Sequence, residues 1–376
     1  PTLAEMLARH GFHNISVCSN KFMSRFFRWD RGFHEFFDEL LPRHVKRTLI
    51  PRSAWDFIRA LTKTVLTKTT TASRILNFMK RVKKNISDRI PVPYPIASKI
   101  VAFVRRQLLD SLQRHEKTFL WVHFMDTHFP FYSDIWRDFF DSPEEFMAFL
   151  TKLYFKSPRR MRREELYFIR AAYRESIKYV DKKFGELMRD LEEHGLLEDS
   201  LVIITADHGE ELLEHGRLGH WYLHVHNELI RVPLIIWGMQ REVIDGPASS
   251  TDIAPTLLNL LRIRTPSTYF RRNILDSRGF RIMFSEGARI QYGGDVDYSN
   301  FSIATIIWPW KLILSTFGRL RIELYHLERD PSERKNIAHE HPDLTKEMLR
   351  IAMDHIERSK RYRERIHLLR KIRRRT

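Results

Sequence analysis

The 376-residue sequence contains one cysteine, Cys18, and no apolar run long enough to cross a bilayer. A single cysteine excludes a framework of internal disulfides and favours a reducing compartment such as the cytoplasm. The chain begins Pro1-Thr-Leu-Ala-Glu, with neither an initiating methionine nor a secretion signal. No internal repeat is found.

Positive charge is abundant. The 64 basic and 47 acidic residues give a formal net charge of +17. Such an excess favours anionic partners in general, whether sulfate or phosphate esters, nucleic acid or a lipid surface, and does not select one of them. With 43% hydrophobic residues, a chain of this length can bury a large core and add a smaller domain to it.

The most informative stretch is Leu201-Val-Ile-Ile-Thr-Ala-Asp-His-Gly-Glu, in which an apolar run leads directly into a polar cluster. The run predicts a short strand buried on both faces. Asp207 and His208 then lie at its carboxyl end, which is where ligands bind in open α/β sheets. A carboxylate beside an imidazole can hold a metal there, but the same residues are also common in a plain strand-to-loop turn.

The neighbouring segments help to decide between a metal site and a plain turn. A helix-like segment precedes the strand, and four motifs follow it: Glu214-His-Gly, Gly219-His, Arg231-Val-Pro-Leu-Ile-Ile and Thr251-Asp-Ile-Ala-Pro-Thr-Leu-Leu. The third of these predicts a second buried strand. This succession resembles the sulfatase family of the alkaline phosphatase superfamily, and the resemblance covers nearly the whole chain. It implies an α/β fold, with a large mixed central sheet flanked by helices and a small C-terminal antiparallel sheet plus helix.

A second motif follows another apolar run, which predicts a buried strand at Phe119-Leu-Trp-Val-His-Phe. The next residues, Met125-Asp-Thr-His-Phe-Pro, resemble the family's "M-D-x-H-x-P" segment. The resemblance implies that His128 contacts the leaving-group or sulfuryl oxygen of the ester. An imidazole at a strand end can donate to an anionic oxygen or act as a general acid. The alternative is a histidine that only closes the turn before Pro130.

In the family, a Lys or His beyond the central motif also reaches the ester oxygens. His220 matches that position best, although the spacing to Pro233 is about one residue longer than usual. His224 is the second candidate. Three imidazoles, with His226 as the third, could instead form a separate zinc site; the order of the family motifs argues against it.

The resemblance further implies one divalent metal, held by two adjacent Asp near the start of the domain and by a later Asp-Asn or Asp-His pair. Asp207 and His208 match the later pair. Mn or Zn suits an imidazole better than Ca, which prefers oxygen ligands, and Mg is a fourth candidate. We expect the basic insertion at residues 43–93 to be a solvated helical segment; an anion-binding lid is the alternative.

The family nucleophile is a formylglycine hydrate made from Cys or Ser, or an unmodified Ser or Thr in relatives that act on phosphate. Neither that segment nor the early Asp pair occurs in this sequence, and Cys18 lies after the place where the nucleophile would stand. We therefore expect an N-terminally incomplete chain that by itself turns over little and binds metal weakly. The expected domains are a sulfatase-like core at 1–265, a small-sheet subdomain at 266–356 and a basic tail at 357–376.

Three functions remain open at this point. The first is metal-dependent hydrolysis of small-molecule or polymeric sulfuric esters. The second uses the same fold on phosphorus, as a phosphodiester or phosphonate hydrolase or a phosphoethanolamine-type transferase, and His208 in place of Asn favours it slightly. The third is a non-catalytic module that binds an anionic polymer through its net positive charge. No motif indicates specific nucleic-acid recognition, and the oligomeric state is not indicated.

Overall fold

The computed structural model describes residues 1–38, 94–107, 109–114, 117–238, 247–267, 273–276, 281–290 and 296–373. The chain divides into two compact units. The first comprises residues 1–202 with short segments at 216–219 and 237–239, and the second comprises 203–215, 220–236 and 240–376. The basic insertion expected at residues 43–93 lies outside the described residues. None of the described helices combines the length and apolarity needed to cross a membrane.

The first unit is built on a parallel three-stranded sheet with the order β2-β1-β3. Its strands are β1 (His13–Cys18), β2 (Glu35–Phe37) and β3 (Thr118–His123). Ile15 and Val17 of β1 are fully buried, because their side chains pack in one cluster with helices α4 (Ala97–Gln107) and α5 (Leu109–Arg114). This cluster is the core of the parallel sheet.

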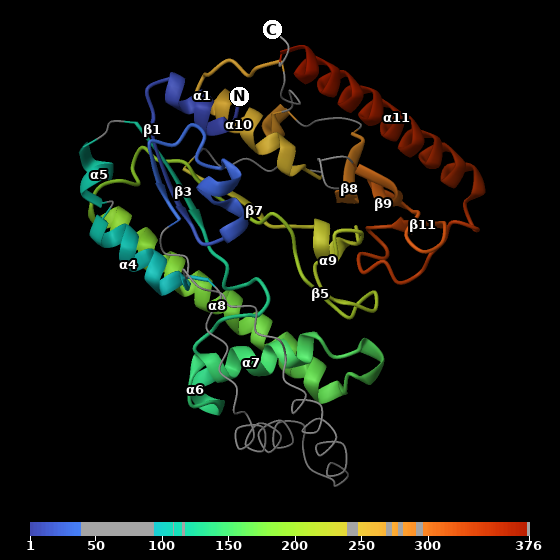
Figure 1. The fold of residues 1–376 in the computed structure, drawn as a ribbon, viewed down its shortest axis with the longest axis horizontal. Helices are drawn as coiled ribbons and strands as arrows, with labels where there is room; N and C mark the ends of the chain where they lie inside the picture. Colours follow the sequence, from blue (N-terminus) through green and yellow to red (C-terminus); the bar gives the residue numbers. More distant parts are fainter. Residues whose placement is uncertain are drawn as a thin grey trace. The chain divides into compact units, whose positions relative to one another are not determined.

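Helices cover this sheet. The 31-residue α8 (Arg163–Glu193) packs against α4, and Leu187 of α8 joins the same core (Figure 1). Helix α1 (Leu3–Arg9) begins at a capping box in which Thr2 and Glu5 satisfy each other's backbone N–H groups. The remaining elements of this unit are η1 (Lys21–Met23), η2 (Arg25–Phe27), α6 (Trp136–Phe139), α7 (Pro143–Tyr154), η3 (Pro158–Arg160) and β6 (Leu218–Gly219).

The second unit contains an antiparallel four-stranded sheet with the order β11-β10-β9-β8. Its strands are β8 (Met283–Ile290), β9 (Val296–Ile307), β10 (Trp310–Ser315) and β11 (Arg321–His326). Gly318 lies in the turn between β10 and β11 with a φ of +73°, a conformation that favours glycine. Helix α11 (Pro342–Arg373) packs on β9 and β10 (Figure 1). The small sheet and helix expected from the sequence are thus confirmed.

The motif strands lie in a separate two-stranded sheet formed by β4 (Val202–Thr205) and β7 (Leu234–Trp237). The expectation that these strands, and β3, are buried is wrong. Every residue of β3 is half-buried, Thr205 is exposed, and Ile235 is 52% exposed. Among the described residues, β4 and β7 pair only with each other and β3 lies at the edge of its sheet, so neighbouring strands cover these three strands less than they would in the middle of a large sheet.

Short elements complete the second unit. They are β5 (Glu211–Leu212), α9 (Asn227–Ile230), η4 (Ser250–Asp252), α10 (Ile253–Leu260) and η5 (Ile274–Asp276). β5 and α9 bound the loop that carries two of the candidate functional side chains, His220 and His224.

Candidate active site

Asp207 and His208 lie immediately after β4, where the sequence places them. The Asp207 side chain is 65% exposed and that of His208 is 34% exposed. Oδ1 of Asp207 accepts a hydrogen bond from the backbone N–H of His208 at 3.0 Å. This bond holds the carboxylate against the start of the loop, in reach of solvent.

The orientation of His208 suits a metal ligand. Its Nδ1 lies 2.9 Å from the carbonyl oxygen of Gly209. Because a carbonyl only accepts, Nδ1 carries the proton, and in the neutral ring Nε2 carries the lone pair. Nε2 lies 3.8 Å from Oδ2 of Asp207, so both donor atoms can reach one ion. Since a divalent ion takes four or more ligands, the pair supplies part of a coordination shell.

Gly209 allows the loop to turn close to the chain that follows. Its N–H donates to the carbonyl of Leu229 at 2.8 Å. A Cβ at this position would lie 2.0 Å from the carbonyl oxygen of Glu228. Only glycine therefore permits this approach, and the close approach sets where the Asp207-His208 pair lies.

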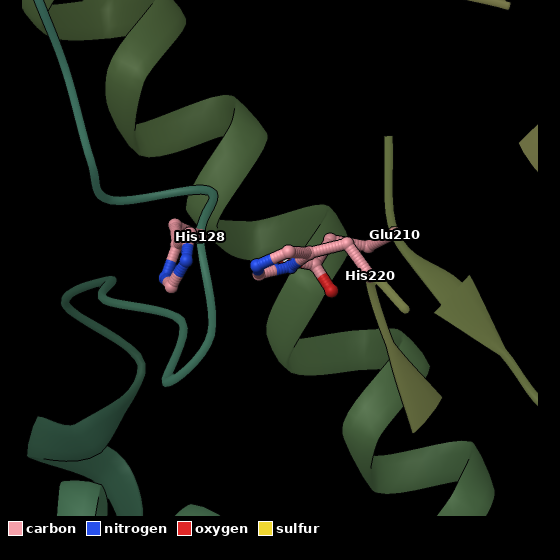
Figure 2. Close-up of side chains that lie close together, drawn as sticks. All are labelled: His128, Glu210 and His220. Atoms are coloured by element: carbon pink, nitrogen blue, oxygen red, sulfur yellow. The ribbon is translucent and has the colours of Figure 1, made fainter. Parts of the chain in front are cut away.

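His220 lies beside this pair. Its ring stacks on that of His208, with centroids 4.3 Å apart and planes 27° apart. Nδ1 of His220 donates to Oε1 of Glu210 at 3.1 Å (Figure 2). That hydrogen bond, to a carboxylate that is 3% exposed, raises the pKa of His220. The structure thus brings Asp207, His208 and His220 together.

His224 has a different environment. Its side chain is 9% exposed, and Nδ1 donates to Oε2 of the fully buried Glu211 at 2.8 Å. A histidine that is buried and paired with a buried carboxylate is suited to holding the loop. This environment favours His220 over His224 as the residue that meets a substrate.

His128 belongs to the first unit, on the turn after β3. Its Nδ1 lies 2.6 Å from the carbonyl oxygen of Phe129, so Nδ1 again carries the proton. Asp126 ties this turn to the start of α4. Both its carboxylate oxygens accept from the N–H of Ala97, at 3.0 and 3.1 Å. Burial raises the pKa of Asp126 to about 7. No sequence motif assigns a function to Asp126, and its contacts are those of a structural residue.

Sequence reasoning did not find a group of buried charges in the second unit. His215 is hydrogen-bonded to Glu228 through Nδ1, and its Nε2 lies 3.0 Å from the carbonyl oxygen of Glu333. His226 is hydrogen-bonded to Glu323 at 3.2 Å. Apart from the His215–Glu228 pair, these partners are about a hundred residues apart in the chain, so no local pattern could have revealed them.

Comparison with known proteins settles the family. A sequence model of the family described as Sulfatase matches residues 1–263. The chain belongs to the sulfatase family. Members of this family are metal-dependent, and the described residues of this sulfatase chain include groups of histidine and acidic side chains that could hold an ion.

Two curated relatives illustrate the match. The chain is 28% identical over 196 residues to arylsulfatase K of Bos taurus, covering 48% of this chain and 35% of that protein. It is 30% identical over 179 residues to choline-sulfatase of Rhizobium meliloti (strain 1021), covering 45% of this chain and 33% of that protein. The match therefore spans about a third of the length of these relatives.

The fold is shared with solved structures. Phosphonate monoester hydrolase of Agrobacterium radiobacter superposes with a TM-score of 0.58 at 18% identity, covering 96% of this chain and 80% of that one. The α/β class and the alkaline phosphatase-like architecture expected from the sequence are confirmed.

Proposed function

We propose that this protein hydrolyses sulfuric esters with the help of one divalent metal ion. The observation that carries the proposal is the geometry of Asp207 and His208. Their donor atoms lie 3.8 Å apart at the end of β4, and the hydrogen bond to Gly209 sets the tautomer that a metal ligand needs. Membership of a metal-dependent family supports the same assignment.

The bound ion would neutralise charge on one ester oxygen. Asp207 and His208 are the proposed ligands, and the nitrogen ligand favours Mn or Zn over Ca or Mg. His220 is proposed to donate to the ester oxygens, because its hydrogen bond to Glu210 favours the protonated ring. His128 is proposed to donate to the leaving-group oxygen. The proposed substrates are small-molecule or polymeric sulfate esters.

These residues all lie within the proposed core of residues 1–265. Residues 266–356 and 357–376 are the proposed small-sheet subdomain and basic tail. A cytoplasmic site of action remains a prediction that rests on Cys18. That thiol is buried, and burial raises its pKa to about 11, so it is a poor nucleophile.

Hydrolysis of a phosphonate or phosphodiester is the second candidate function. The observation that favours it is the imidazole of His208 at the metal pair, where an amide is the common alternative in sulfatases. Sulfate and phosphate esters are both tetrahedral anions, so the same metal and imidazole donors serve either.

The test compares turnover of 4-nitrophenyl sulfate and of a phenyl phosphonate by the protein purified from its own source. We expect sulfate hydrolysis that EDTA abolishes and Asp207→Ala lowers by at least about 100-fold, as loss of a metal ligand should. Asp199→Ala, which removes an exposed carboxylate elsewhere, should change neither. Turnover of the phosphonate alone would establish the second candidate. Binding of sulfated polymer without any turnover, unaffected by EDTA and by His208→Ala, would refute both.

A further inference from the structure

Arginine side chains are concentrated in the first unit where helix α8 begins. From Lys156 to Arg174 the chain has seven basic and two acidic residues. Arg159 and Arg160 lie on η3, Arg163 is the first residue of α8, and all three side chains are exposed. Like charges placed so close together repel one another, which costs stability unless a bound anion offsets the repulsion.

The positive charge continues along one face of α8. Side chains that follow one another at intervals of three or four residues are neighbours on a helix surface. Four exposed residues of α8 are spaced in this way: Arg163, Tyr167, Arg170 and Arg174. At a rise of about 1.5 Å per residue, the row is about 16 Å long. This row and the two arginines of η3 together form a surface that we call the arginine surface.

The arginine surface is not neutralised by nearby carboxylates. Glu165, one of the two acidic residues of the segment, is buried and already holds the ammonium of Lys156 at 2.5 Å and the guanidinium of Arg162 at 2.9 Å. Among the described residues, no carboxylate forms an ion pair with four of the guanidinium groups of the surface, those of Arg159, Arg160, Arg163 and Arg174. These groups can therefore meet an anionic ligand without first breaking an ion pair.

The segment that carries the arginines of η3 is fixed to the helices on both sides. The buried pair of Lys156 and Glu165 joins the residues after α7 to α8. Helix α7 itself packs on α8 through the rings of Phe149 and Phe168, whose centroids lie 5.2 Å apart (Figure 1). A surface that is already ordered loses little entropy when it binds a ligand.

The turn that carries His128 packs on the same two helices. Phe129 stacks on Tyr154, the last residue of α7, with ring centroids 4.2 Å apart. Phe131 contacts Tyr173 of α8, with ring centroids 5.0 Å apart. An anionic polymer held by the arginine surface would thus be kept beside the turn whose histidine is proposed to act on the leaving group.

We propose that the arginine surface binds a sulfated polysaccharide. This inference rests on the proposed function and narrows its substrates to polymeric sulfate esters. A guanidinium group presents paired N–H donors, which match two oxygens of a tetrahedral anion. Tyr167, 49% exposed between Arg163 and Arg170, offers a flat ring to the carbon face of a sugar. Sites for single-stranded nucleic acid stack successive bases on several rings, whereas this row carries one.

The first test measures the affinity of the full chain for heparin, a sulfated polysaccharide, at several salt concentrations. Arg163→Gln with Arg174→Gln removes two charges and keeps good helix formers. Affinity should fall by about 10-fold at low salt, and the slope of log affinity against log salt should fall by about 2. Arg106→Gln with Arg114→Gln removes two exposed arginines of α4 and α5 and should change little. Equal losses in both pairs would show an effect of net charge alone and overturn the proposal.

A rescue variant and two further ligands test the chemistry of recognition. Arg163→Lys with Arg174→Lys keeps the charge and loses the forked donors, so it should restore the salt slope and only part of the affinity. No recovery of the slope would contradict the proposal. Heparin stripped of its sulfate groups should bind at least about 10-fold more weakly. Single-stranded DNA that binds more tightly than heparin, with the same loss in the Gln pair, would assign the surface to nucleic acid and overturn the proposal.

Turnover separates this inference from the proposed function. With a sulfated polysaccharide as substrate, the Gln pair should raise KM by about 10-fold and keep kcat, because the surface binds the chain away from the reacting ester. An unchanged KM would overturn the inference and leave hydrolysis of 4-nitrophenyl sulfate as evidence for the proposed function. Heparin binding that depends on the arginine surface, in a protein that hydrolyses neither substrate, would refute the proposed function and support the surface.

Discussion

The imidazole of His220 packs face to face on the imidazole of His208, with ring centroids 4.3 Å apart. Each ring has its own hydrogen-bond partner, Gly209 for His208 and Glu210 for His220. The stack therefore links a proposed metal ligand to a proposed substrate donor, and each ring restricts the orientation of the other.

Replacement of His220 should separate these two roles. His220→Phe keeps a ring against His208, so metal affinity should change little, whereas His220→Ala should lower it by up to about 10-fold through loss of the supporting contact. Both variants remove the proposed donor and should lower the rate of ester hydrolysis equally. Metal titration and turnover of the same samples check this. Full hydrolysis by His220→Phe would exclude His220 as a donor.

Asp126 should make stability depend on pH. Its pKa is raised by burial from 3.8 to about 7 in the folded chain. The folded state thus holds this proton more tightly than the unfolded state, and the contribution of Asp126 to stability falls as pH rises from about 4 to about 7. Asp126→Asn retains an acceptor for the N–H of Ala97 and should lose this dependence. Asp126→Ala should lose the hydrogen bond from the N–H of Ala97, the first residue of α4, at about 1 kcal/mol. Denaturant unfolding at pH 4, 6 and 8 checks both, and an unchanged slope in Asp126→Asn would contradict the assignment.

Gly209→Ala should damage the metal pair. The added Cβ would meet the carbonyl oxygen of Glu228 at 2.0 Å, and backbone displacement of this kind costs about 1–3 kcal/mol. Metal affinity should fall with stability, because the shift moves Asp207 and His208. Gly185→Ala is the matched control. It lies within α8, where the nearest atom is 3.8 Å from the new Cβ, and should stabilise by about 0.5–1 kcal/mol. Equal effects of Gly209→Ala and Gly185→Ala on Tm would refute the predicted clash at Gly209.

His215 should stabilise the protein most at neutral and acid pH. Burial alone would lower its pKa, but hydrogen bonds to Glu228 and to the carbonyl of Glu333 raise it from 6.5 to about 9. This stabilisation is complete below about pH 6.5 and is lost as pH rises through about 9. Glu228→Gln removes the main partner, so its Tm should fall less than that of the parent between pH 7 and 9. Glu198→Gln, at an exposed position, should behave as the parent. Parallel Tm curves for all three proteins would disprove the pairing.

The motif residues were predictable because they depend on near neighbours in the chain. Asp207 lies two residues after the end of β4. Thr2 caps α1 through a hydrogen bond to Glu5, three residues along the chain. Gly318 marks its hairpin because few residues other than glycine adopt that turn. Burial was predicted less well. The apolar runs of β3, β4 and β7 indicated buried strands, but burial depends on which elements pack on both faces, and the residues of a run do not encode this.

The sequence by itself determined the family, the adjacency of Asp207 and His208 at a strand end, and the small C-terminal sheet with its helix. These features rest on local spacing, backbone propensity and the order of motifs. Only the tertiary structure decided that Glu323 backs His226 and that Glu333 meets both His215 and Lys311. The pairs Glu323–His226, Glu333–His215 and Glu333–Lys311 are 97, 118 and 22 residues apart in the sequence. Contacts over such separations depend on how β10, β11 and the turn after β11 fold back toward the loop between β5 and α9.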